Sequence, residues 1–292
     1  MMWKVFLHEH KSSRDPFEVF KNLFASSSTS FILDSPHHHG PDTRYTFMGC
    51  DPFLELRIRN GRIVLRGEEE TSYPAASLRL VLCRLFEKYK VQKPARFDFF
   101  TGGAVGYWGY EMAAYFEKVS FRKKAGFNLP LLFLAFYRDV IVYDHVRKIY
   151  LLACLLPKDT SNFSQLDSRR KRLRSYFETR GLKAAASPFR IAHTKADLSR
   201  HEFCSIVKKT KEYIAAGDIY QANISQRFSF SFKGSPLALY EQLRKINPSP
   251  FSSLLKSQDF VIVSSSPERL IQKKGRLCET RPIAGTRPRY RT

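Results

Sequence analysis

The sequence predicts a chain of mixed helices and strands with room for two domains. Apolar residues recur at helical spacing in 16–24 and 76–90. Apolar and polar residues alternate on both sides of Asn60-Gly61, a dipeptide typical of a two-residue hairpin turn. The chain has 292 residues, which at roughly 150 residues per domain corresponds to about two domains. Its hydrophobic fraction of 43% is enough for a sizeable core and argues against a disordered chain.

Other elements of the first half follow from the same patterns. Residues 31–35 (FILDS) predict a strand, and residues 133–156 predict two buried strands around Asp144-His145. Residues 102–106 (GGAVG) superficially resemble a phosphate-binding loop, but the aromatic residues that follow favour a close-packed strand crossing. The three histidines at 37–39 lie in a loop rich in proline and glycine, where an exposed loop is favoured over a metal site.

The composition changes after residue 157, where a basic helix and a linker of small residues are predicted. Ser199 with Glu202 forms a capping box that begins a further helix, and Gly217 suits its left-handed end. We therefore expect three parts, namely an N-terminal domain over 1–158, a basic helix and linker over 159–195, and the first part of a second domain over 196–292.

The chain is strongly basic, with 49 Lys and Arg against 27 Asp and Glu and a formal net charge of +22. Such a charge favours anionic partners. The densest basic run, 169–174, is interpreted as the solvated face of a helix carrying Leu166, Leu173 and Phe177, because charge runs are usually solvated faces. No interleaved aromatic residues accompany it, so nucleic-acid binding is not expected.

The sequence points to a reducing cytoplasm. Its five cysteines are scattered without CxxC spacing, so neither a disulfide framework nor a structural zinc site is expected. The N-terminus meets charges before any apolar run, unlike a signal peptide. The longest apolar stretch, 129–137, is far shorter than the ~20 residues of a membrane-spanning helix, so no membrane association is expected.

The segment Pro282-Ile283-Ala284-Gly285-Thr286 has the chemistry of an anion-binding loop. Glycine lets a ligand approach the backbone, and the Thr286 hydroxyl with nearby N–H groups can donate to a carboxylate. Arg281, Arg287 and Arg289 make the region positive. An ordinary turn rich in proline and glycine is the alternative.

Four motifs occur in order along the second half: GDIYQANISQRF (217–228), NPSPF (247–251), SSPERL (265–270) and TRPIAGTRPR (280–289). In this order and spacing they resemble the chorismate-binding domain shared by anthranilate synthase component I and aminodeoxychorismate synthase component I. FILDS, RYTFMGCDPF and FTGGAVGYWGYEM are similar to the N-terminal domain of that family. The resemblance extends over nearly the whole chain.

The resemblance implies an α+β fold of two packed antiparallel β-sheets with peripheral helices, with 196–292 as the first part of the catalytic domain. It implies chorismate as substrate, ammonia from a glutamine amidotransferase subunit, and Mg²⁺ on the substrate carboxylate. By motif, Gly285 and Thr286 would contact chorismate. The site where anthranilate synthases bind tryptophan would be lined by Ser35, Asn247, Pro248, Ser249, Pro250 and Phe251.

The end of the sequence departs from the family. There the acidic Mg²⁺ ligands and the catalytic histidine follow the PIAGT motif, whereas this sequence ends shortly after Thr286. We therefore expect a truncated or frameshifted reading frame or a split gene, with no catalytic residue or metal ligand to name. The chain by itself is expected to be inactive.

Other differences separate the two enzymes. Some aminodeoxychorismate synthases carry a nucleophilic lysine where Ala284 stands, so this sequence fits anthranilate synthase or the enzymes with the PIAGT form. The short segment before FILDS, and NPSPFS in place of NPSPYM, favour an aminodeoxychorismate synthase of 4-aminobenzoate and folate biosynthesis. The alternatives are anthranilate synthase component I of tryptophan biosynthesis, and a non-catalytic remnant or half of a split protein that acts only through partner binding.

Overall fold

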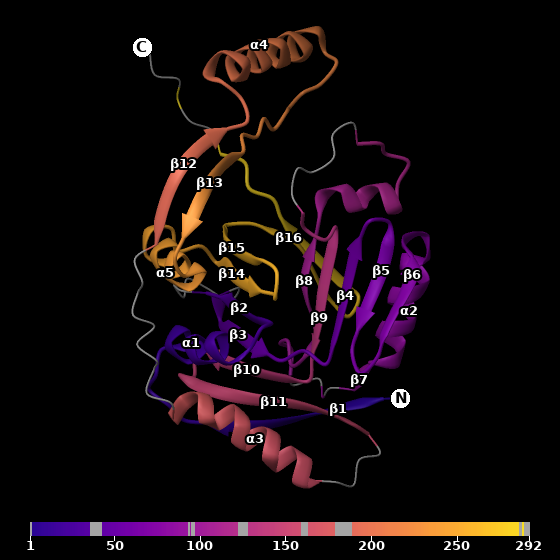
Figure 1. The fold of residues 1–292 in the computed structure, drawn as a ribbon, viewed down its shortest axis with the longest axis vertical. Coiled ribbons are helices and arrows are strands. Elements are labelled where there is room, and N and C mark those ends of the chain that lie inside the picture. Colours follow the sequence, from indigo (N-terminus) through magenta and orange to yellow (C-terminus); the bar gives the residue numbers. More distant parts are fainter. Residues whose placement is uncertain are drawn as a thin grey trace. The chain divides into compact units, whose positions relative to one another are not determined.

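The computed structural model describes residues 2–35, 43–92, 94, 97–121, 128–158, 163–178, 189–285 and 288 (Figure 1). The chain divides into two compact units. The first unit consists of Met1–Ala184 with Tyr240–Thr292, and the second of Ala185–Leu239. The histidines at 37–39 and the residues Thr286, Arg287 and Arg289 lie outside the described residues.

Sheet A of the first unit has eight strands in the order β15-β14-β2-β3-β10-β11-β1-β7. The strands are β1 (Trp3–His10), β2 (Ser30–Asp34), β3 (Tyr45–Cys50), β7 (Val91–Gln92), β10 (Asp139–Asp144), β11 (Ile149–Pro157), β14 (Phe251–Lys256) and β15 (Val261–Ser266). All neighbours are antiparallel except β1 and β7. Strands from both ends of the sequence thus form one sheet.

Sheet B has five antiparallel strands in the order β6-β5-β4-β9-β8. They are β4 (Leu54–Arg59), β5 (Arg62–Arg66), β6 (Glu70–Pro74), β8 (Gly103–Trp108) and β9 (Leu132–Tyr137). A separate ribbon in the first unit pairs β16 (Arg269–Lys274) with β17 (Leu277–Arg281).

The two sheets pack face to face, and β9 shows how. Phe133, Ala135 and Tyr137 of β9 join Val140 and Val142 of sheet A in one buried cluster. The alternate residues of β9, namely Leu132, Leu134 and Phe136, enter a second cluster on the other face of sheet B. Because successive side chains of a strand point to opposite faces, this strand is buried on both sides.

Helices cover the outer faces of this pair of sheets. In sheet A, α1 (Pro16–Ser26) contacts β2 and β3, while α3 (Phe163–Glu178) contacts β10 and β11 (Figure 1). In sheet B, α2 (Leu78–Lys88), preceded by the 3-10 turn Ala75–Ser77, packs on the second cluster. A second 3-10 segment, Tyr110–Tyr115, follows β8. The predicted α+β fold of two packed antiparallel sheets with peripheral helices is confirmed.

The prediction of two strands in 133–156 was wrong, because this region forms three. The chain leaves sheet B after β9, turns at Arg138 and enters sheet A as β10 before it reverses into β11. Both β9 and β10 are buried on two faces, so the sequence is apolar on either side of the turn. A continuous apolar run cannot show where a chain passes from one sheet to another.

Two glycine predictions are confirmed. Asn60 and Gly61 have φ values of 52° and 71° and join β4 to β5, as the two-residue turn requires. Gly106 lies in β8, where a Cβ atom would come within 1.8 Å of the carbonyl oxygen of Phe133. The glycine-rich stretch 102–106 therefore permits close strand contact, as predicted.

The second unit contains β12 (Arg190–Ala196), α4 (Arg200–Ala216) and β13 (Phe228–Lys233). The Ser199–Glu202 capping box is present, and Gly217 ends α4 with φ of 84°. Helix α5 (Pro236–Ile246) begins in this unit and ends in the first. The boundaries of these compact units differ from the predicted ranges 1–158, 159–195 and 196–292. Those ranges refer to the domain organisation of the family, and they stay a prediction.

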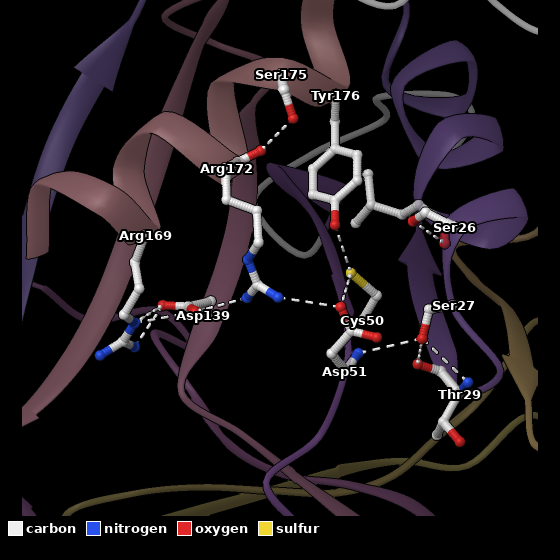
Figure 2. Close-up of polar contacts among 11 residues, drawn as sticks. Ser26, Ser27, Thr29, Cys50, Asp51, Asp139, Arg169, Arg172, Ser175 and Tyr176 are labelled. Atoms are coloured by element: carbon white, nitrogen blue, oxygen red, sulfur yellow. Dashed lines mark hydrogen bonds and ion pairs between the residues drawn. The ribbon is translucent and has the colours of Figure 1, made fainter. Parts of the chain in front are cut away.

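The basic run is less solvated than its sequence suggests. Helix α3 buries Leu166, Leu173 and Phe177, as predicted, but two of its arginines also face the sheet. The Arg169 side chain is only 18% exposed and forms an ion pair with buried Asp139 at the start of β10 (Figure 2). Its Nε donates to both carboxylate oxygens, at 2.9 and 3.0 Å.

A second arginine of α3 extends this contact. Arg172 donates to Asp139 at 2.9 Å and to Asp51 at 3.0 Å (Figure 2). Beside it, the hydroxyl of Tyr176 lies 3.3 Å from Cys50 Sγ, where burial raises the pKa of the thiol to about 12. The run therefore attaches α3 to sheet A.

Among the described residues, none of the helices combines the length and apolar character that a membrane span needs.

We expect Asp139→Asn to lower the free energy of unfolding by about 3–5 kcal/mol, because it leaves the largely buried Arg169 without its charge partner. Denaturant unfolding of purified protein measures this. Lys171→Gln is the matched control, since Lys171 is exposed on the same helix. That variant should stay within about 0.5 kcal/mol of the native protein. Equal losses in both variants would contradict this role of Asp139.

Candidate functional site

The pairing of β14 with β2 brings together two segments predicted to share a site. In this pairing Ser252 lies opposite Asp34, so Ser35 comes next to Pro250. The Ser35 hydroxyl is 3.3 Å from the carbonyl oxygen of Pro250 and 3.4 Å from that of Tyr45, and shares its proton between them. Ser35 is only 5% exposed. The predicted proximity of Ser35 to 247–251 is therefore present in the structure.

The segment 247–251 is held by its own hydrogen bonds. The Ser265 hydroxyl donates to the carbonyl oxygen of Asn247 at 2.5 Å and lies 2.9 Å from the buried Ser249 hydroxyl. Ser252 donates to the carbonyl oxygen of Ser249 at 2.8 Å. The hydroxyls of the site are thus engaged within the protein, whereas Asn247 and Pro248 are exposed.

Phe251 completes the segment. The guanidinium of Arg269 lies over its ring, 5.3 Å from the centroid, and pairs with Glu279 at 2.6 Å. The cation–π contact with this paired arginine helps to hold the partly buried ring in position.

The carboxylate of Asp34 is buried next to Ser35. The sequence analysis did not identify Asp34 as a site residue. The Asp34 side chain is 1% exposed, and Arg244 Nε donates to it at 2.5 Å from the end of α5. Tyr240 of the same helix donates to the same oxygen at 3.3 Å. Arg244 is three residues before Asn247, and Asp34 directly precedes Ser35. This ion pair therefore connects the two segments that form the site.

Thr46 of β3 joins these groups. Its hydroxyl donates to Asp34 at 3.2 Å and accepts from the Ser35 N–H at 3.3 Å. His145 Nε2 lies 2.8 Å from the same oxygen. Which of these two atoms donates depends on the tautomer of His145. Three segments of the chain, those of Asp34-Ser35, Thr46 and His145, therefore meet at one buried hydroxyl.

Burial controls the ionisation of this cluster. It raises the pKa of Asp34, against the opposing effects of the Arg244 charge and the Thr46 hydrogen bond. Burial also raises the pKa of Tyr240, so its phenol stays protonated and able to donate. The cluster supplies a charged pair and fixed donors, which position the backbone on both sides of the site.

The predicted anion loop is described only in part. Gly285 is exposed, and a Cβ atom at this position would meet no atom within 4 Å. Arg281 Nε donates to Glu279 at 2.7 Å, so its charge is partly compensated. Thr286 lies outside the described residues. The role of Gly285 and Thr286 in substrate binding stays a prediction.

Mg²⁺ was expected on the substrate rather than on these residues. Within the described part of the chain, no group of three or more His, Cys, Asp or Glu side chains is placed to hold a metal ion. The described residues therefore do not fit a complete Mg²⁺ ligand set.

Comparisons with known proteins point to one family. A family model described as chorismate binding enzyme matches residues 28–292. Anthranilate synthase component 1 of Acetivibrio thermocellus is 32% identical over 288 residues, which are 95% of this chain and 58% of that protein. Aminodeoxychorismate synthase component 1 of Bacillus subtilis is 31% identical over 284 residues, which are 96% of this chain and 59% of that protein.

A solved structure has a similar fold. Anthranilate synthase component I from Streptococcus pneumoniae superimposes with a TM-score of 0.65 at 23% sequence identity. The match covers 82% of this chain and 54% of that one. The chain thus spans less than two thirds of the length of the relatives it matches.

We expect Thr46→Val to reduce the free energy of unfolding by about 1–3 kcal/mol, because it removes the acceptor of the buried Ser35 N–H and one of the hydrogen bonds to Asp34. Thermal and denaturant unfolding measure this. Thr71→Val is the control, since Thr71 is exposed in β6 of sheet B and valine also suits a strand. A loss no larger than that of the control would show that Thr46 does not organise the site.

Proposed function

Because the chain belongs to the family of chorismate-binding enzymes, we propose that it is part of a synthase that aminates chorismate to aminodeoxychorismate. The observation that carries the proposal is the match of residues 28–292 to this family, which includes the TRPIAGTRPR motif. Sequence identities of 31–32% do not separate the two named activities among the relatives. The choice between them rests on the residues near Ser35.

Those residues support the aminodeoxychorismate synthase lineage. We infer that Ser35 and 247–251 occupy the position where anthranilate synthases bind tryptophan. In this chain the Ser35 and Ser249 hydroxyls are buried in internal hydrogen bonds. Phe251 has no hydroxyl, and Ser252 is turned back onto Ser249. An incoming amino acid would have to break these bonds, so feedback by tryptophan is not expected.

The proposed reaction involves further components. Chorismate carries two carboxylates, and the basic surroundings of Gly285 and Thr286 suit an anion. Ammonia would come from a glutamine amidotransferase subunit, and Mg²⁺ would stabilise charge on the substrate carboxylate. Anthranilate synthase is the second candidate, because Ala284 and the PIAGT form fit both enzymes.

The product formed from chorismate distinguishes the two candidate activities. The chain would be incubated with chorismate, ammonium and Mg²⁺, alone and extended by the corresponding C-terminal segment of the Bacillus subtilis relative. We expect no turnover by the chain alone, because its described residues supply no metal-ligand set. The extended protein should form aminodeoxychorismate, detected as 4-aminobenzoate after addition of a lyase. Anthranilate as the product would favour the second candidate, and absence of both from a folded protein would contradict chorismate amination.

The same extended protein tests the anion loop. Thr286→Val keeps the side-chain volume but removes the hydroxyl. Loss of a hydrogen bond to a charged carboxylate should reduce kcat/KM by roughly 10- to 150-fold, with little change in thermal stability. An ordinary turn predicts unchanged kinetics.

Tryptophan distinguishes the two lineages by binding. If the site held tryptophan, a concentration of about 100 times Kd would increase the free energy of unfolding by ~2.7 kcal/mol. We expect no such increase, because the Ser35 and Ser249 hydroxyls are engaged. Phenylalanine serves as the control ligand. A tryptophan-specific increase that disappears in Ser35→Ala would favour anthranilate synthase.

A further inference from the structure

A pocket of about 670 Å³ lies outside the candidate site and shares no residue with it. It is lined by one face of α2, by the end of β5 and the start of β6, and by Phe53, Tyr89 and Arg138. It therefore lies on the outer face of sheet B, within the first unit.

Arg138 is the feature that distinguishes this pocket. It occupies the turn where the chain passes from β9 to β10. Its guanidinium lies 4.4 Å from the ring centroid of Phe53 and 5.3 Å from that of Trp3, and these two rings stack on each other at 5.8 Å. One face of the guanidinium is thus covered by aromatic rings, which limits where the charge can move.

This guanidinium has no anionic partner among the residues that the structure describes. Its Nε atom is buried without a hydrogen-bond acceptor. The adjacent Asp139 instead binds Arg169 and Arg172. Burial, together with the nearby Arg169 charge, lowers the pKa of Arg138, against the smaller attraction of Glu68, which forms no ion pair with it. A partly buried cation without a counter-ion is costly, and a guanidinium presents paired donors that match a carboxylate.

The rest of the lining combines balanced charge with apolar surface. Arg84 and Lys88 of α2 and Glu68 and Glu69 at the β5–β6 turn are all exposed, so water screens these four charges and Arg138 is the partly buried charge of the pocket. Leu80 of α2 lines the pocket although it is 52% exposed, and Val81 and Leu85 lie behind it. An anion that binds here would also cover apolar surface.

We propose that this pocket binds a small organic carboxylate with an apolar body, whose carboxylate pairs with Arg138. The carboxylate would supply the missing acceptors, and the apolar body would lie against Leu80, Val81 and Leu85. An inorganic anion satisfies only the first requirement, because it buries no apolar surface.

The probe is 3-phenylpropionate, compared with its neutral amide and with inorganic phosphate. Binding is followed by calorimetry and by fluorescence of Trp3, since Arg138 lies over that ring. We expect saturable binding of 3-phenylpropionate, and clearly weaker binding of the amide and of phosphate. Arg138→Gln should weaken the binding of 3-phenylpropionate by roughly tenfold or more, the loss expected for a charged hydrogen bond.

Two further variants keep the test decisive. Arg79→Gln on α2 removes a charge from an exposed position that does not line the pocket, so it should bind as the native protein does. Leu80→Glu places a negative charge at the half-exposed entrance and should abolish binding while the protein stays folded. It also tests the pocket should Arg138→Gln fail to fold.

The outcomes that overturn the proposal are specific. Binding of the amide as tightly as the acid would show that the carboxylate does not contribute to binding. Phosphate binding as tightly as 3-phenylpropionate would show a simple anion site without an apolar contribution. Unchanged affinity in Arg138→Gln or in Leu80→Glu, or no saturation at millimolar concentration, would each exclude this pocket.

Discussion

The antiparallel pairing of β14 with β2 is the constraint on which the first unit depends. It joins segments more than two hundred residues apart, since Ser35 and Pro250 are separated by 215 positions. The entropy of closing so long a loop grows only slowly with its length, whereas the pairing completes sheet A and buries Leu254 and Leu255. Without it, β2 would be an open edge and the two halves of the candidate site would not meet.

Buried carboxylates hold much of the basic charge in place. Asp34, Asp139 and Asp144 have side-chain exposures of 1%, 8% and 2%, and each pairs with an arginine from a distant part of the chain. These pairs attach α5, α3 and the segment before β3 to sheet A. Some of the 49 Lys and Arg residues therefore serve structural ion pairs and do not contribute to the net charge of +22, and Arg138 differs because it has no such pair among the described residues.

Local elements were predictable because short-range interactions determine them. The Asn60-Gly61 turn, the Ser199–Glu202 capping box and the left-handed Gly217 each depend on residues a few positions apart. Gly106 was also correctly assigned, since its aromatic neighbours exclude a phosphate loop. The three strands of 132–157 were not predictable, because burial on both faces removes the alternation that marks a strand boundary.

The sequence by itself determined the mixed helix and strand content and the family, because hydrophobic periodicity and ordered motifs are properties of the linear chain, and the resemblance to the family implied the association of Ser35 with 247–251. Only the tertiary structure decided that Arg244 pairs with Asp34, that Thr46 joins Ser35 to His145, and that Arg169 is buried against Asp139. Each of these contacts joins residues from different elements. Their energy depends on burial and distance, which exist only once the sheet has assembled.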